Sequence, residues 1–133
     1  MITARLEETK YKLTDVIAKQ GASTEVVALF EQVVNQIDAV LRSQGKPVFF
    51  RTHIYGVTGF CNARKGFMFV NLRQGYVATL YFTGGAAIHG LAKANWLNKG
   101  DNKGSETVRI TDVPSIKKAV EYACAAYDIA AKS

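Results

Sequence analysis

The spacing of hydrophobic residues changes along the chain. In the first third, apolar residues recur every three or four positions, which is the period of an amphipathic helix. The clearest stripe consists of Val26, Phe30, Val33, Ile37 and Leu41. Ser23 or Thr24 is placed to cap the start of this helix, and Gly45 and Pro47 follow its end. The pattern therefore predicts a helix that buries one face.

A looser pattern of the same kind precedes it. Leu6, Leu13, Val16 and Ile17 are spaced as on one side of a helix, and Gly21 is suited to the left-handed conformation that ends one. We expect a helix from about Thr3 to Gln20. Residues 1–20 would then form an accessory helix of the domain.

From Val48 onward the period becomes two, with the β-branched and aromatic residues typical of strands. Strands are expected near Val48–Tyr55, Val57–Asn62, Gly66–Leu72 and Tyr76–Phe82. The glycine-bearing connections at residues 63–66 and 73–75 are short enough to join only neighbouring antiparallel strands. These four strands are therefore predicted to form a meander.

The end of the chain predicts one more strand and one more helix. In residues 105–111 Val108 and Ile110 alternate with polar residues, and Asp112 is placed to cap a helix that accepts Pro114 in its first turn. Ile116, Val120, Ala123 and Tyr127 mark the buried side of that helix. The fold class expected is a single α+β domain over residues 1–133. Its order is α-α-β-β-β-β-loop-β-α, and helices pack on one face of a five-stranded, mainly antiparallel sheet.

Alternation within the strands assigns side chains to the two faces of this sheet. In the strand at residues 48–55, Val48, Phe50, Thr52 and Ile54 suit the core under the helices. Arg51, His53 and Tyr55 would then point outward, as would Arg109 on the last strand.

The net charge of +6 is unevenly distributed. Residues 1–45 hold five Lys and Arg against six Asp and Glu, and residues 112–133 hold three of each. Residues 46–111 hold nine cations, with Asp101 and Glu106 as their only acids. The excess positive charge therefore lies in the segment of the predicted sheet, where it can attract an anionic partner.

A segment of unusual composition runs from Gly84 to Gly104, "GGAAIHGLAKANWLNKGDNKG". Ordinary connections are about four to six residues long. Glycine-rich basic loops can capture anions with backbone N–H groups and lysines, here Lys93, Lys99 and Lys103. Trp96 either stacks on a base or, as we prefer, anchors the segment to the core.

Several chemistries lack their sequence signatures. The chain has no G-x-S-x-G, no H-E-x-x-H and no phosphate-binding G-x-x-x-x-G-K-[ST]. His53 and His89 are the only imidazoles, so the one catalytic alternative is a ribonuclease that uses histidine and lysine. We expect no cofactor.

The cysteines and the hydropathy of the chain indicate the cellular compartment in which the protein is expected. Cys61 and Cys124 are isolated and read as reduced thiols. The chain has no apolar run long enough to cross a bilayer, and its first residues do not resemble a secretory signal. We therefore expect a cytoplasmic protein.

The segments "GFMFVNLRQGYVATLYF" and "NWLNKGDNKGSETVRITDVPSIKKAVEYACAAYD" resemble a family of small bacterial domains of unknown function. This family is similar to the frataxin-like YdhG group and, more loosely, to the MmcQ/YjbR-type fold. The resemblance implies a sheet-plus-helix fold, and for the YdhG group an iron-chaperone role. Metal delivery of the frataxin kind relies on an acidic surface, whereas acids are scarce in residues 46–111 of this chain.

Together these patterns predict a non-catalytic binding domain for an anionic partner. Nucleic acid is the first choice and a phosphorylated small molecule the second, held by the basic sheet face and the segment 84–104. The alternatives are a frataxin-like metal chaperone and a protein-interaction domain or homodimer. The candidate binding residues are Arg51, His53, Tyr55, Arg64, Lys65, Arg73, Lys93, Trp96, Lys99, Lys103 and Arg109.

Overall fold

Six strands form one sheet whose order follows the chain. The computed structural model describes residues 1–82 and 108–132. Its strands are β1 (Leu6–Glu7), β2 (Phe49–His53), β3 (Gly56–Asn62), β4 (Lys65–Leu72), β5 (Val77–Tyr81) and β6 (Val108–Ile110). β1 pairs with β2 in parallel, and every other pairing is antiparallel. The α+β class is confirmed, with six strands rather than five.

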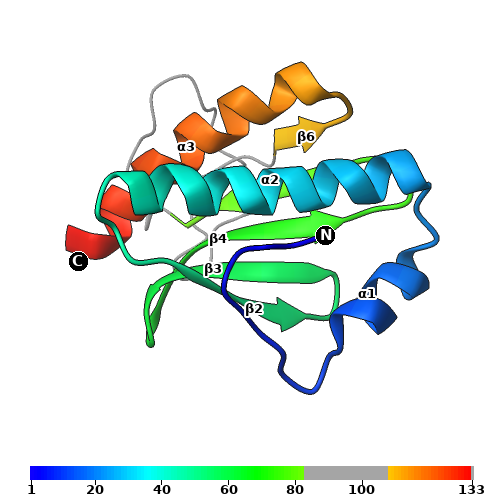
Figure 1. Cartoon of the computed structure of the whole chain (residues 1–133), viewed down its shortest axis with the longest axis horizontal. Helices are drawn as coiled ribbons and strands as arrows, with labels where there is room; N and C mark the ends of the chain where they lie inside the picture. The colour runs from blue at the N-terminus through cyan, green and yellow to red at the C-terminus, as the bar shows by residue number, and fades with distance from the viewer. Residues whose placement is uncertain (83–107, 133) are drawn as a thin grey trace.

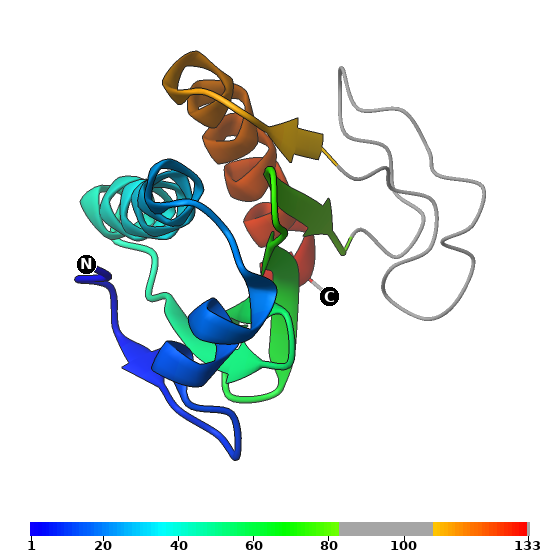
Figure 2. The same ribbon diagram turned by 90° about the vertical axis from the view of Figure 1, so that its right-hand side faces the viewer.

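In the part of the chain that the structure describes, three helices accompany the sheet: α1 (Leu13–Gln20), α2 (Thr24–Ser43) and α3 (Val113–Lys132). Figures 1 and 2 show α2 and α3 on one side of the curved sheet. The predicted caps are confirmed, because the Ser23 hydroxyl accepts a hydrogen bond from the Val26 N–H at 3.2 Å and Gly21 has a φ of 63°. None of the described helices is long and apolar enough to cross a membrane.

The core lies between α2, α3 and the inner face of the sheet. Phe30, Val33, Ile37 and Leu41 of α2 are fully buried, as the helical period predicts. Tyr81 of β5 is also fully buried, and its hydroxyl donates to the Ala119 carbonyl of α3 at 3.1 Å. That bond joins the sheet to α3 within the core, where a buried hydroxyl needs a partner.

The first predicted helix is wrong over its first half. Residues 6–7 form β1 and the helix begins only at Leu13. The reason is tertiary: the Phe50 N–H donates to the Arg5 carbonyl at 2.9 Å, and the Thr9 N–H donates to the Thr52 hydroxyl at 2.9 Å. Pairing with β2 therefore satisfies backbone groups that a helix would have satisfied locally.

The strand at residues 48–55 ends earlier than expected. Val48, Phe50 and Thr52 are buried, as predicted. Ile54 was expected in the core and is 36% exposed, because β2 stops at His53 and Ile54 with Tyr55 forms the turn to β3. The predictions for Lys93, Trp96, Lys99, Lys103 and the rest of segment 84–104 lie outside the described residues.

Candidate functional site: the outer face of the sheet

We call the sheet surface opposite α2 and α3 the outer face. Cross-strand partners share a face, so the register defines its members. One row joins Arg51, Thr58, Phe69 and Leu80 across β2, β3, β4 and β5. The next row joins His53, Gly56, Asn71, Ala78 and Arg109 across β2 to β6.

Charge is divided between the two layers of the fold. Over the described residues 49–82 and 108–110, the strands β2 to β6 and their connections carry five cations and no carboxylate: Arg51, Arg64, Lys65, Arg73 and Arg109. The helices, by contrast, carry six carboxylates (Asp15, Glu25, Glu31, Asp38, Glu121 and Asp128) and five cations (Lys19, Arg42, Lys117, Lys118 and Lys132), so their charges nearly cancel. The sheet layer is therefore positive relative to the helical layer, which gives the protein a directional field.

Arg51 lies at the centre of an aromatic cluster on β2 and β3. Its guanidinium carbon lies 5.1 Å from the Phe49 ring centroid and 4.8 Å from that of Phe60, and the two rings stack with centroids 5.3 Å apart. Its Nε donates to the Glu7 carboxylate at 2.9 Å. Arg5 also lies over Phe49, at 5.2 Å. The cluster thus holds two arginines against one carboxylate.

Two further arginines lie over tyrosine rings. The Arg73 guanidinium is 4.9 Å from the Tyr55 ring centroid, and that of Arg109 is 4.7 Å from the Tyr76 ring. Neither arginine forms an ion pair with a carboxylate among the described residues. A guanidinium held over a ring keeps its N–H donors available at its edge, which suits contact with phosphate oxygens.

These cations are spread along the sheet. Arg64 and Lys65 lie at one end of β4 and Arg73 at the other, which for an eight-residue strand is a separation of about 24 Å. Arg51 and Arg109 lie four strands apart, or about 20 Å. No small anion reaches all of them at once, whereas an extended polyanion can.

His53 and Asn71 carry buried polar atoms without partners. The His53 Nδ1 accepts from the Tyr55 N–H at 3.1 Å, while its Nε2 and the Asn71 Oδ1 form no hydrogen bond with any of the described residues. Burial lowers the pKa of His53, and the backbone of Val57 offsets part of this decrease. His53 is therefore neutral at pH 7 and adds no charge to the outer face.

The outer face also contains an apolar cluster that the sequence analysis did not predict. Leu80 and Phe82 are buried there, with Phe69 packed against them. The rings of Phe69 and Phe82 meet edge to face at 4.5 Å, and the His53 imidazole lies 5.0 Å from Phe69. The outer face is thus part apolar, and its charged groups lie around this cluster.

The described candidate residues therefore fall into groups. Arg51, His53 and Arg109 lie on the outer face, and Tyr55 and Arg73 meet at one end of the sheet. At the other end, Arg64 lies in the turn between β3 and β4 and Lys65 is the first residue of β4. Sequence reasoning missed Arg5, Glu7, Phe49, Phe60 and Tyr76. Alternation could have found Phe49, which is two residues from Arg51 and so shares its face.

We also searched the described residues for groups that could hold a metal ion or act as nucleophiles. These residues contain no group of three His, Cys, Asp or Glu side chains placed to hold a metal ion. Cys61 and Cys124 are free and half-buried, and burial raises the pKa of both thiols. No observation in this part of the chain favours metal transfer or thiol chemistry.

Comparisons with family models, curated proteins and solved structures find no match to this chain.

Proposed function

We propose that the outer face binds single-stranded nucleic acid without catalysis. The observation that carries the proposal is the repeated pairing of an arginine with an aromatic ring, at Arg51, Arg73 and Arg109. The described residues of β2 to β6 and their connections carry no carboxylate. Phosphate contacts supply most of the affinity in such complexes, and stacking of bases on aromatic and guanidinium planes supplies the rest.

Spacing and exposure favour a single strand over other anions. The cations extend over about 20–24 Å, which is too far for a small phosphorylated molecule and suits several consecutive phosphates. Tyr55 is 42% exposed, and Tyr76, Phe49 and Phe60 are partly exposed. Rings of this kind stack on unpaired bases, which a duplex keeps inside its own stack.

The test measures binding of a fluorescent single-stranded oligonucleotide, and of its duplex, at about 50 mM and about 200 mM salt. The double variant Arg73→Gln/Arg109→Gln is compared with Lys117→Gln/Lys132→Gln. Both remove two positive charges, but the control lysines are exposed on α3 in the helical layer. We expect the arginine variant alone to weaken binding and to reduce the slope of log K against log salt by about 1.4.

Three results would overturn the proposal: no binding of the single strand at low salt, equal losses in the two double variants, or tighter binding of the duplex. Equal losses would mean that only net charge matters. Replacement of Tyr55 or Tyr76 by Leu provides a second measurement, because loss of a stacking ring costs about 1–3 kcal/mol while the charge is unchanged.

A further inference from the structure

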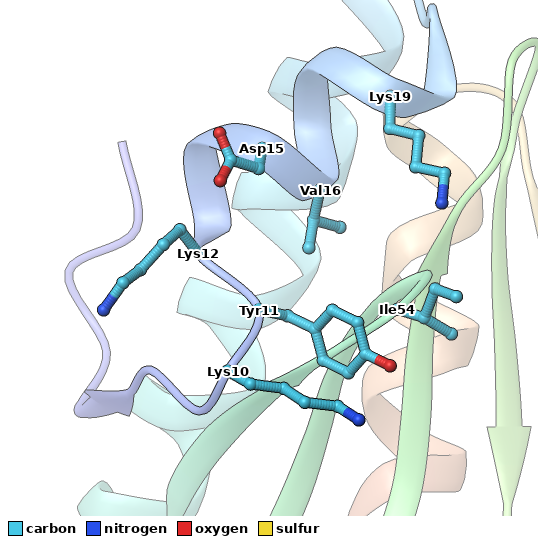
Figure 3. Close-up of a pocket in the computed structure, with 7 residues that line it drawn as sticks. All are labelled: Lys10, Tyr11, Lys12, Asp15, Val16, Lys19 and Ile54. Carbon is cyan, nitrogen blue, oxygen red and sulfur yellow. The ribbon is translucent and has the colours of Figure 1, made fainter.

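A small cavity lies at the edge of the sheet layer, beside α1. Its volume is about 110 Å³, and its walls come from residues 10–12, from α1 and from Ile54 in the turn between β2 and β3 (Figure 3). One water needs about 10–15 Å³ of such space, so the cavity holds a group of several heavy atoms. We call it the α1 pocket.

Its polar lining is positive. Lys10, Tyr11 and Lys19 contribute two ammonium groups and a hydroxyl. In Figure 3 the Lys19 side chain extends toward Ile54 and Lys10 runs beside the Tyr11 ring, with its Nζ 5.2 Å from the ring centroid. The Lys12 and Asp15 side chains, which also border the pocket, point away from that ring.

Neither Lys10 nor Lys19 forms an ion pair with any carboxylate of the described chain. Among the described residues, Asp15 is the one carboxylate that borders the pocket. Two cations around one cavity, neither of them paired with a carboxylate of the described residues, favour an anionic ligand.

The rest of the wall is apolar, and hydrogen bonds hold the segment beside it. Val16 is 3% exposed and forms part of it with Ile54. The Thr52 hydroxyl donates to the Tyr11 carbonyl at 2.6 Å, and the Glu8 carboxylate accepts from the Leu13 N–H at 2.7 Å. These bonds fix the segment that carries Lys10 and Tyr11.

We propose that the α1 pocket binds a phosphomonoester. Such a group carries a charge of about −1.5 to −2 at pH 7, which two lysines match, and its oxygens accept from ammonium and hydroxyl donors. The ligand has two sources: the terminal phosphate of a strand on the outer face, or a free phosphorylated molecule. The first source is favoured by the position of the pocket. Ile54 in its wall precedes Tyr55, and the Tyr55 ring lies under the Arg73 guanidinium of the proposed nucleic-acid site. The inference does not depend on the proposed function of the outer face.

The experiment uses calorimetry on the full chain with two matched pairs of ligands. One pair is ribose 5-phosphate and ribose, and the other is a single-stranded oligonucleotide with and without a 5′-phosphate. The variant is Lys10→Gln/Lys19→Gln, and its control is Lys117→Gln/Lys132→Gln, which removes the same charge from exposed lysines on α3. We expect a phosphorylated ligand to bind more tightly than its partner, with a loss of about fivefold or more in the first variant only.

The outcomes separate the two sources. A gain from the 5′-phosphate that the first variant abolishes identifies the strand end as ligand, whereas saturable binding of ribose 5-phosphate without that gain identifies a small molecule. Equal binding within both pairs, or equal losses in both variants, would overturn the proposal. A different result would contradict only the proposed function of the outer face. In that case the oligonucleotide without a 5′-phosphate does not bind, while ribose 5-phosphate does.

Discussion

The Nε of Arg51 lies 2.9 Å from the Glu7 carboxylate, so β1 brings the one acidic group of the arginine cluster against a cation of the outer face. The two side chains are 35% and 40% exposed. An ion pair as exposed as this contributes little to stability, about 0–1 kcal/mol. Its larger effect is on the field of the outer face, because Glu7 offsets part of the charge of Arg5 and Arg51.

Replacement of Glu7 by Gln is therefore expected to strengthen binding of single-stranded nucleic acid. The affinity should rise about twofold to fivefold at low salt, and the free energy of unfolding should change by less than about 1 kcal/mol. Fluorescence anisotropy and urea unfolding measure the two quantities. Glu121→Gln on α3 removes the same charge from the helical layer, and an equal gain in that control would contradict the prediction.

Thr52 ties the N-terminal segment to the sheet. Its hydroxyl accepts from the Thr9 N–H at 2.9 Å and donates to the Tyr11 carbonyl at 2.6 Å, in a site that is 3% exposed. Thr52→Val keeps the shape of the side chain but removes the hydroxyl, so the Thr9 N–H and the Tyr11 carbonyl lose their hydrogen-bond partner. We expect a loss of about 1–3 kcal/mol in the free energy of unfolding, measured in urea. Faster amide hydrogen exchange at Thr9 should accompany it, and unchanged exchange there would argue against the assigned role.

Gly56 permits a close approach between β3 and β4. A Cβ at this position would lie 2.1 Å from the Val70 carbonyl oxygen, which belongs to the backbone and cannot rotate away. We expect Gly56→Ala to destabilise the protein by about 3 kcal/mol or more. Gly75→Ala is the control, because a Cβ there meets nothing within 4 Å, and its midpoint in urea should stay close to that of the parent protein.

His53 makes stability depend on pH in a defined direction. Burial lowers the pKa of His53 below its ordinary value of 6.5. The unfolded chain therefore takes up the proton at a higher pH than the folded protein, so this residue lowers the free energy of unfolding as the pH falls through 6.5 and further until the folded pKa is passed. Above that range His53 is neutral in both states and has no such effect.

Comparison of the parent protein with His53→Gln isolates that contribution, because the carboxylates of both proteins titrate alike. Urea midpoints at about pH 7.5 and about pH 5 should differ more in the parent than in the variant. An equal drop in both proteins would show that His53 is not the group responsible.

The pattern of hydrophobic positions determined most of the fold. The stripe on α2, the alternation of β2 and the glycine-bearing turns each depend on local periodicity, so these elements are readable from the chain, as are the caps at Ser23 and Asp112. Of the candidate site, the separation of charge was visible for the same reason, because the cations follow one another along the strands.

What tertiary structure decided is which groups meet across the fold. β1 forms because residues 6–7 pair with the edge of β2. In this register Leu6 lies opposite Phe50, 44 positions later in the chain, and no local sequence pattern predicts such a pairing. The same contact neutralises part of Arg51 with Glu7, and the turn at Ile54 places that residue beside Lys19 in the α1 pocket. Periodicity reports which side of an element is apolar, whereas partners distant in sequence depend on the packing of whole elements, which only the three-dimensional structure shows.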